Sequence, residues 1–264
     1  MPWFSWWRRK KNAAASSAAV PAARPLYVPG RETVTAAESH YVIPNDLREA
    51  NRLDLQHFAL HEYFGTNVFA PVHNPQRILD VASGTGRWAK ELKAQFPAAQ
   101  VTGLDVSVPL EIQEHGQPSE YTFVQANVLE PLPFPDASFD YVHMRFVFTA
   151  VPAQQWPVVV RALMRVTAPG GWIELVEAYL PTEGGPAFAQ LEAWGQQLVG
   201  SRGIELAQGR NVGQFLREAG ATSVTERSGA LPIGPYGGRV GQIMGMDIFT
   251  GYRLVAPALV QGLG

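Results

Sequence analysis

The 264-residue chain lacks cysteine entirely and contains no uninterrupted apolar run of about 18 residues. Without cysteine it cannot form a disulfide framework, a thiolate zinc site or a thiol nucleophile. Without a long apolar run, the sequence predicts no membrane-spanning helix. Hydrophobic residues make up 46% of the chain, an ordinary content for a globular protein, so a folded core of one or two domains is expected.

Strong charge of one sign is also lacking, because the net charge is only −2. The charge is nevertheless uneven. Residues 1–36 carry six basic groups and one acidic group, a net +5, whereas the other 228 residues carry 15 basic and 22 acidic groups, a net −7. An acidic body lacks the clustered cations that phosphate binding requires, which argues against a nucleic-acid partner.

Residues 1–36 are predicted to form a disordered basic and aromatic tail, since the stretch 12–23 is rich in Ala and Ser and offers little to bury. In residues 1–11 (MPWFSWWRRKK) the charges follow the aromatics, which is not the order of a secretory signal. An alternative hypothesis is weak contact of residues 1–11 with an anionic membrane surface. The absence of cysteine and of an export signal favours a cytoplasmic location.

Residues 37–264 are predicted to form a single domain in which short strands alternate with helices. A first helix, capped within Pro44-Asn45-Asp46, runs through Phe64 and is expected to end before Pro71. A later helix opens at Pro152 and is expected to turn Val158, Leu163 and Val166 inward. Strands are expected at 77–82, 100–105, 121–126, 139–144 and 172–176, and further helices at 87–96, 186–200 and 211–219. This alternation predicts an α/β, doubly wound, Rossmann-like and mostly parallel sheet with helices on both faces.

The strongest local motif is the segment 78–86, ILDVASGTG, with Asp105 lying 19 residues beyond Gly86. Glycines at 84 and 86 let a ligand approach the backbone of a strand-to-helix turn, and the following helix presents free N–H groups. A carboxylate at position 105 can accept the hydroxyls of a ribose. The pattern also satisfies a loose nicotinamide-dinucleotide fingerprint, but Asp80, four residues before Gly84, and the mid-chain position of the loop argue against that cofactor.

These residues together resemble the class I S-adenosylmethionine-dependent methyltransferases, which share the order Asp80-x-x-x-Gly84-x-Gly86, Asp105, Asn127-Val128, the strand at Phe139-Asp140, and Pro169-Gly170-Gly171. The segments 41–46 (YVIPND), 52–57 (RLDLQH) and 139–145 (FDYVHMR) are similar to those of the LaeA-like methyltransferases of fungal secondary metabolism. The resemblance covers residues 41–180 well and the remainder weakly.

The resemblance implies S-adenosylmethionine as cofactor and a small-molecule acceptor. It divides the domain into an N-terminal cap helix (41–75), a cofactor-binding core (77–180) and acceptor-side helices with the last strand (181–264). The loop would hold the methionine end of the cofactor, with Asp80 near its amino group, while Asp105 would bind the ribose. The implied cofactor-binding residues are Tyr41, Arg52, Asp80, Ala82, Ser83, Gly84, Gly86, Asp105, Val106, Asn127 and Val128, of which Val106, Asn127 and Val128 would meet the adenine, and Tyr41 and Arg52 would close the site.

Candidate catalytic residues are few, because a sulfonium-bound methyl group is already electrophilic and needs mainly an aligned nucleophile. His143, near the end of the fourth expected strand, is a candidate base or cofactor contact, and the alternative is a packed histidine. Glu177 is a candidate contact for acceptor or solvent. His57 and His61 are four residues apart but have no third nearby ligand, so no metal site is expected.

One departure from the family concerns the end of the sheet. The superfamily normally ends with an antiparallel strand that returns beside the sixth, here expected at 222–231. No further strand is recognisable after Leu231, so this strand is expected to be missing, through truncation or through pairing with another subunit. This departure motivates an alternative function, a methyltransferase-fold binding or regulatory protein without turnover; a nicotinamide oxidoreductase is a third hypothesis. The oligomeric state is not predicted.

Overall fold

A seven-stranded sheet forms the centre of the protein in the computed structural model, which describes residues 2–8, 43, 46–179 and 185–263. The strand order is β4-β3-β2-β5-β6-β1-β7. The first five are mutually parallel, as predicted: β4 (Thr122–Gln125), β3 (Gln100–Asp105), β2 (Arg77–Val81), β5 (Phe139–Arg145) and β6 (Thr167–Ala178). The doubly wound, mostly parallel arrangement is therefore confirmed.

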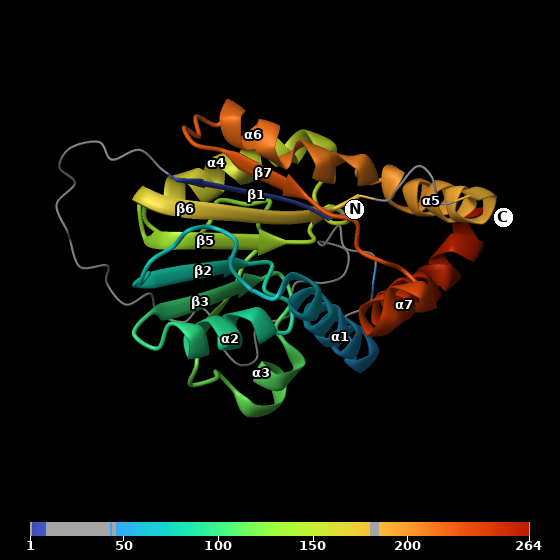
Figure 1. Cartoon of the computed structure of the whole chain (residues 1–264), viewed down its shortest axis with the longest axis horizontal. Coiled ribbons are helices and arrows are strands. Elements are labelled where there is room, and N and C mark those ends of the chain that lie inside the picture. Colours follow the sequence, from blue (N-terminus) through green and yellow to red (C-terminus); the bar gives the residue numbers. More distant parts are fainter. Residues whose placement is uncertain (1, 9–42, 44–45, 180–184, 264) are drawn as a thin grey trace.

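The sixth strand in spatial order comes from the N-terminus of the chain. β1 (Pro2–Arg8) runs antiparallel between β6 and β7 (Thr225–Ser228), with Pro2 opposite Ala178 and Trp3 opposite Ser228 (Figure 1). The expectation that the antiparallel strand is missing is thus wrong, because the N-terminal segment takes its place.

The prediction of a disordered tail is likewise wrong for residues 2–8. Aromatic residues favour strands once neighbouring strands are available for pairing, and here strands are present on both sides. Contact of residues 1–11 with an anionic membrane surface stays a prediction. Residues 9–36 lie outside the described residues.

Helices cover both faces of the sheet (Figure 1). On one face α2 (Arg87–Gln95) and α3 (Leu110–His115) bury Trp88, Leu92 and Ile112. On the other face α4 (Trp156–Val166) and α6 (Val212–Glu218) pack against the alternate side chains of the strands. In α4, Leu163 and Val166 are buried as predicted, but Val158 is exposed, because the helix turns its neighbours Val159 and Val160 toward the sheet.

Three helices lie beyond the carboxyl ends of the parallel strands: α1 (Leu47–Phe64), α5 (Gly185–Gly200) and α7 (Gly238–Leu263) (Figure 1). The Asp46 carboxylate caps α1 by accepting the N–H groups of Arg48 and Glu49. The sequence had not indicated α7, which packs along α1. Short 3₁₀ segments occur at Ala153–Gln155, Leu206–Asn211 and Pro235–Gly237.

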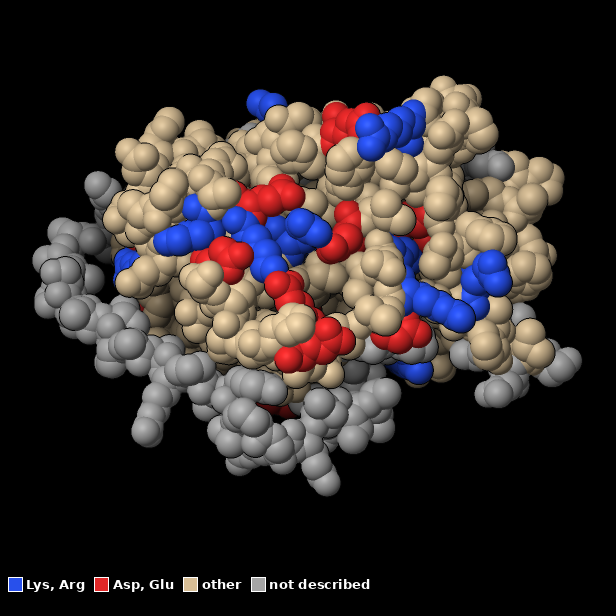
Figure 2. All heavy atoms as spheres, turned by 90° about the horizontal axis from the view of Figure 1, so that it is seen from below, with Lys and Arg blue, Asp and Glu red and all other residues tan. Residues whose placement is uncertain are grey.

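Two surface properties follow from the described part of the chain. Its helices include none with the length and apolar character needed to cross a bilayer. Figure 2 shows basic and acidic side chains lying beside one another on the face seen from below. Ion pairs that join α2 to α3 and to α1 include Lys90–Glu111 at 2.6 Å and Arg87–Asp54 at 3.0 Å.

Candidate active site

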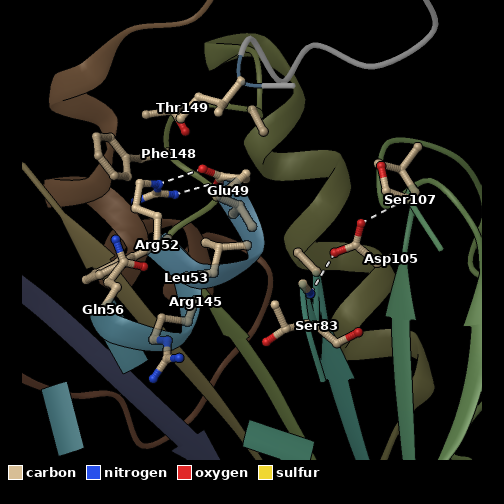
Figure 3. Close-up of a pocket in the computed structure, with 18 of the residues that line it drawn as sticks. Glu49, Arg52, Leu53, Gln56, Ser83, Asp105, Ser107, Arg145, Phe148 and Thr149 are labelled. Atoms are coloured by element: carbon tan, nitrogen blue, oxygen red, sulfur yellow. Dashed lines mark hydrogen bonds and ion pairs between the residues drawn. The ribbon is translucent and has the colours of Figure 1, made fainter. Parts of the chain in front are cut away.

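A cavity of about 380 Å³ opens at the carboxyl ends of β2, β3 and β5, the edge where ligands bind in open parallel sheets. Loops that follow these strands form its floor, and α1, α5 and α7 form its walls. Figure 3 shows Glu49, Arg52, Leu53 and Gln56 projecting from α1 on one side, with Ser83, Asp105 and Ser107 on the other. The cavity has the size of a small-molecule site.

The loop between β2 and α2 has the backbone that its glycines predict. Gly84 and Gly86 adopt φ values of +55° and +77°, in the left-handed region, and Ala82 joins them at +56°. At Gly86, which caps α2, a Cβ would lie 2.1 Å from the Tyr121 hydroxyl, so both conformation and space require glycine. Ala82, Ser83 and Gly84 line the cavity, whereas Gly86 lies behind the loop and does not.

Asp105, at the end of β3, is held against this loop. Its Oδ2 accepts the Gly84 N–H at 2.9 Å, and its Oδ1 accepts the Ser107 N–H at 2.9 Å. Burial raises the pKa of Asp105 to about 6, because loss of hydration outweighs the stabilisation from these hydrogen bonds. The carboxylate is therefore fixed in place by the backbone, and its oxygens can each accept a further hydrogen bond from a ligand.

Asp80 and His143 form a buried pair on adjacent strands. They stand opposite each other in the β2–β5 register, with His143 Nδ1 2.9 Å from Asp80 Oδ1. The imidazole also stacks on Trp88, with ring centroids 3.9 Å apart. Both residues line the cavity, and the geometry favours a role for His143 in orienting Asp80. A role for His143 as a catalytic base stays a prediction.

The predicted adenine contacts converge on the same cavity. Val106, Asn127 and Val128 all line it, and Asn127 accepts the Leu129 N–H through its side-chain oxygen at 3.0 Å. Ser83 also lines the cavity, but its Oγ is buried close to Gly103 of β3 and has no hydrogen-bond partner among the described residues.

Arg52 occupies a different setting from the one implied for it. Its guanidinium binds both carboxylate oxygens of Glu49 at 2.6 Å and Oδ1 of Asp247 at 2.6 Å. Gln56 donates to the other oxygen of Asp247 at 3.1 Å. Arg52 lines the cavity, but its main described contacts tie α7 to α1. Tyr41, predicted to act beside Arg52, lies outside the described residues.

Glu177 and His57, two other candidate residues, are held by contacts within the protein. Glu177 is fully buried and does not line the cavity, so it is not placed to contact an acceptor there; it accepts the N–H groups of Val147 and Phe148, which do line it. Burial raises the pKa of Glu177 to about 8. His57 Nε2 lies 2.9 Å from Glu91, and its Nδ1 accepts from Arg145 at 3.1 Å.

Sequence reasoning missed Asp247 and Arg145 as parts of this site. Asp247 is 195 residues from Arg52, in a segment with no recognisable pattern. Arg145 lies within the FDYVHMR segment, but its position was not assigned a role. Individual residues of the expected acceptor side (181–264) were not assigned, and the cavity lining there and in the loop after β5 is mainly apolar: Phe146, Phe148, Leu198, Val199, Ile248 and Val255.

Part of this chain is similar in sequence to known methyltransferases. Residues 78–171 match the family model for the methyltransferase domain. Methyltransferase str3 of Strobilurus tenacellus is 40% identical over 141 residues, which cover 52% of this chain and 48% of that protein. The secondary metabolism regulator laeA of Aspergillus flavus is 27% identical over 209 residues, covering 74% and 54%.

A solved structure supports the fold. An O-methyltransferase family protein from Burkholderia thailandensis superposes with a TM-score of 0.53 at 18% identity, covering 69% of this chain and 56% of that one. At this identity the likeness concerns the fold alone. The chain spans about half the length of the curated relatives it matches most strongly.

Proposed function

We propose that this chain is a class I S-adenosylmethionine-dependent methyltransferase of the LaeA-like group and that it transfers a methyl group from S-adenosylmethionine to a small-molecule acceptor. The observation that carries the proposal is the pairing of Asp105 with the glycine loop. A carboxylate that accepts the N–H of Gly84 is fixed at the end of β3, beside the cavity, where a ribose diol can donate to it.

The residues present fit this cofactor. Asp105 would accept the ribose hydroxyls. Val106, Asn127 and Val128 would flank the adenine, while Asp80, oriented by His143, would meet the amino group. When bound, the cofactor supplies a sulfonium-activated methyl group.

The rest of the chain would align the acceptor and exclude water. Apolar side chains from the loop after β5, from α5 and from α7 wall the acceptor side, so an acceptor with an apolar body fits it. Excluding water strengthens polar contacts at the reacting atoms and prevents hydrolysis. The Arg52–Asp247 ion pair would hold α7 in place as one wall of this chamber.

The test is calorimetric titration with S-adenosylhomocysteine, the stable product of the proposed reaction. The wild-type chain is expected to bind it in the micromolar range. Asp105→Ala is expected to weaken binding at least ~100-fold, because charge-assisted hydrogen bonds to two hydroxyls are lost at ~1.5–3 kcal/mol each.

Asp136→Ala provides the matched control, since Asp136 is exposed and pairs with Arg165 away from the cavity. This variant is expected to bind as the wild type does. A folded wild-type chain that does not bind the product would contradict the proposal.

Affinity is also expected to depend on pH through Asp105. Its pKa of about 6 in the free protein means that the carboxylate becomes protonated as the pH falls through 6. A protonated carboxyl loses acceptor capacity, so affinity for S-adenosylhomocysteine is expected to fall about tenfold per pH unit below that pKa. Titrations at a series of pH values between about 5 and 8 check this, and Asp105→Asn is expected to bind weakly with little dependence on pH. A wild-type profile as flat as that of Asp105→Asn would show that the carboxylate does not contact the ligand.

A methyltransferase-fold binding or regulatory protein without turnover is the second candidate. Among the described residues that line the cavity, no side chain is an evident general base, and His143 is already hydrogen-bonded to Asp80. This observation favours retaining the second candidate. Methylation of any acceptor that disappears in Asp105→Ala would exclude it. The absence of a nucleic-acid partner and the cytoplasmic location stay predictions.

A further inference from the structure

Three arginines line the cavity in the described part of the chain, and they differ in their partners. Arg52 binds Glu49 and Asp247. Arg87 pairs with Asp54 at 3.0 Å and is half exposed. Arg145 alone of the three has no carboxylate within ion-pair distance among the described residues, and its hydrogen-bond partner is a histidine nitrogen.

Arg145 is placed beside Asp80 by the sheet. In the β2–β5 register Asp80 faces His143 and Val81 faces Met144, so Arg145, the last residue of β5, stands level with the start of the glycine loop. Figure 3 shows its guanidinium directed to the opposite side of Leu53 from the guanidinium of Arg52. The two arginines therefore serve different parts of the cavity.

The partner of Arg145 is a neutral imidazole. Burial, followed by the charge of Arg145, lowers the pKa of His57, so that its Nδ1 carries a lone pair and accepts from the guanidinium. His57 Nε2 lies 2.9 Å from Glu91 but makes no hydrogen bond of good geometry among the described residues. His57 therefore orients Arg145 but does not neutralise it.

A buried guanidinium without an anion is unfavourable, because hydration is lost and no carboxylate replaces it. Burial accordingly lowers the pKa of Arg145. A ligand anion that reaches this position would recover the lost interaction, and a guanidinium can bind a carboxylate through two parallel N–H groups.

We propose that Arg145 binds the carboxylate of the amino-acid end of S-adenosylmethionine, while Asp80 takes the ammonium group of the same end. The zwitterion then meets one cation and one anion on neighbouring strands, and His57 acts as a positioning residue for the cation. This inference rests on the proposed function, because the carboxylate belongs to the cofactor.

The experiment compares two ligands by calorimetry: S-adenosylhomocysteine and the analogue in which hydrogen replaces its carboxylate. The wild-type chain is expected to prefer the carboxylate ligand by about 10- to 100-fold. Arg145→Met is expected to lose that preference. Its affinity for S-adenosylhomocysteine should fall, while its affinity for the analogue should stay within about twofold of the wild-type value. Arg145→Lys keeps a cation but lacks the planar guanidinium, so its preference for the carboxylate ligand is expected to lie between those of the wild type and Arg145→Met.

Arg161→Met is the matched control, because Arg161 is exposed on α4 and is expected to keep the full preference. If Arg145→Met and Arg145→Lys lose affinity for both ligands to the same extent, Arg145 has a structural role and the inference is overturned. A wild-type chain that binds both ligands equally would also overturn it, a result that does not depend on the folding of any variant. A wild-type chain that binds neither ligand would instead overturn the proposed function.

Discussion

Deletion of residues 1–8 is expected to abolish cooperative folding of the domain. β1 pairs with β6 over seven residues and with β7 over four, so its removal exposes one edge of β6 and leaves the edge strand β7 without its partner in the sheet. At a net ~1 kcal/mol per backbone hydrogen bond, the loss approaches the whole stability of a typical domain, ~5–15 kcal/mol. The freed edge of β6 is long and apolar, which favours aggregation.

Thermal unfolding and size-exclusion chromatography of the deletion variant measure these effects. A synthetic peptide of residues 1–11 added to the deleted chain serves as the control, and it is expected to restore part of the cooperative transition by pairing in trans. A deleted chain that stays monomeric and unfolds at the wild-type temperature would show that β1 contributes nothing to the sheet.

Arg52→Met is expected to destabilise the domain by about 3–5 kcal/mol. The substitution leaves the carboxylates of Glu49 and Asp247 buried without their shared guanidinium, and it removes an ion pair that joins α1 to α7. For a domain of this size the loss corresponds to a fall of about 10 °C in the midpoint of thermal unfolding. Arg161→Met, which removes an exposed arginine from a helix, is expected to shift the midpoint by at most 1–2 °C, on the order of ±0.5 kcal/mol.

The pH dependence of this loss provides a second readout. Burial raises the pKa of Asp247, and Arg52 opposes that rise. Without Arg52 the folded-state pKa moves further above the unfolded value, so the folded state holds its proton over a wider range and stability falls as the pH rises through that range. Arg52→Met is therefore expected to lose less stability at low pH than at neutral pH, and an equal loss at both would contradict the assignment.

The sequence predicted the five-stranded parallel core well because local patterns determine it. Short β-rich runs such as 100–105 end at polar residues, and the helix after Gly86 begins where the glycine loop requires it. Asp105 and Gly84 could be paired in advance, since parallel strands place their carboxyl ends at one edge.

The remaining features depend on contacts between distant residues. The strand character of residues 2–8 is decided by β6 and β7, which lie more than 150 residues away. The Arg52–Asp247 pair spans 195 residues, and α7 begins in glycine-rich sequence that by itself disfavours a helix. Arg145 was visible in its motif, but only the structure shows that its partner is an uncharged ring.

The position of β1 also affects how the chain is made. The residues of β1 are synthesised well before their partners, since Ala178 follows Pro2 by 176 positions and the β7 partners of this strand come later still. During synthesis the segment must therefore stay unpaired, with its tryptophans exposed to chaperones and to neighbouring nascent chains, until most of the domain has emerged. Closing so long a loop makes β1 a late step in folding.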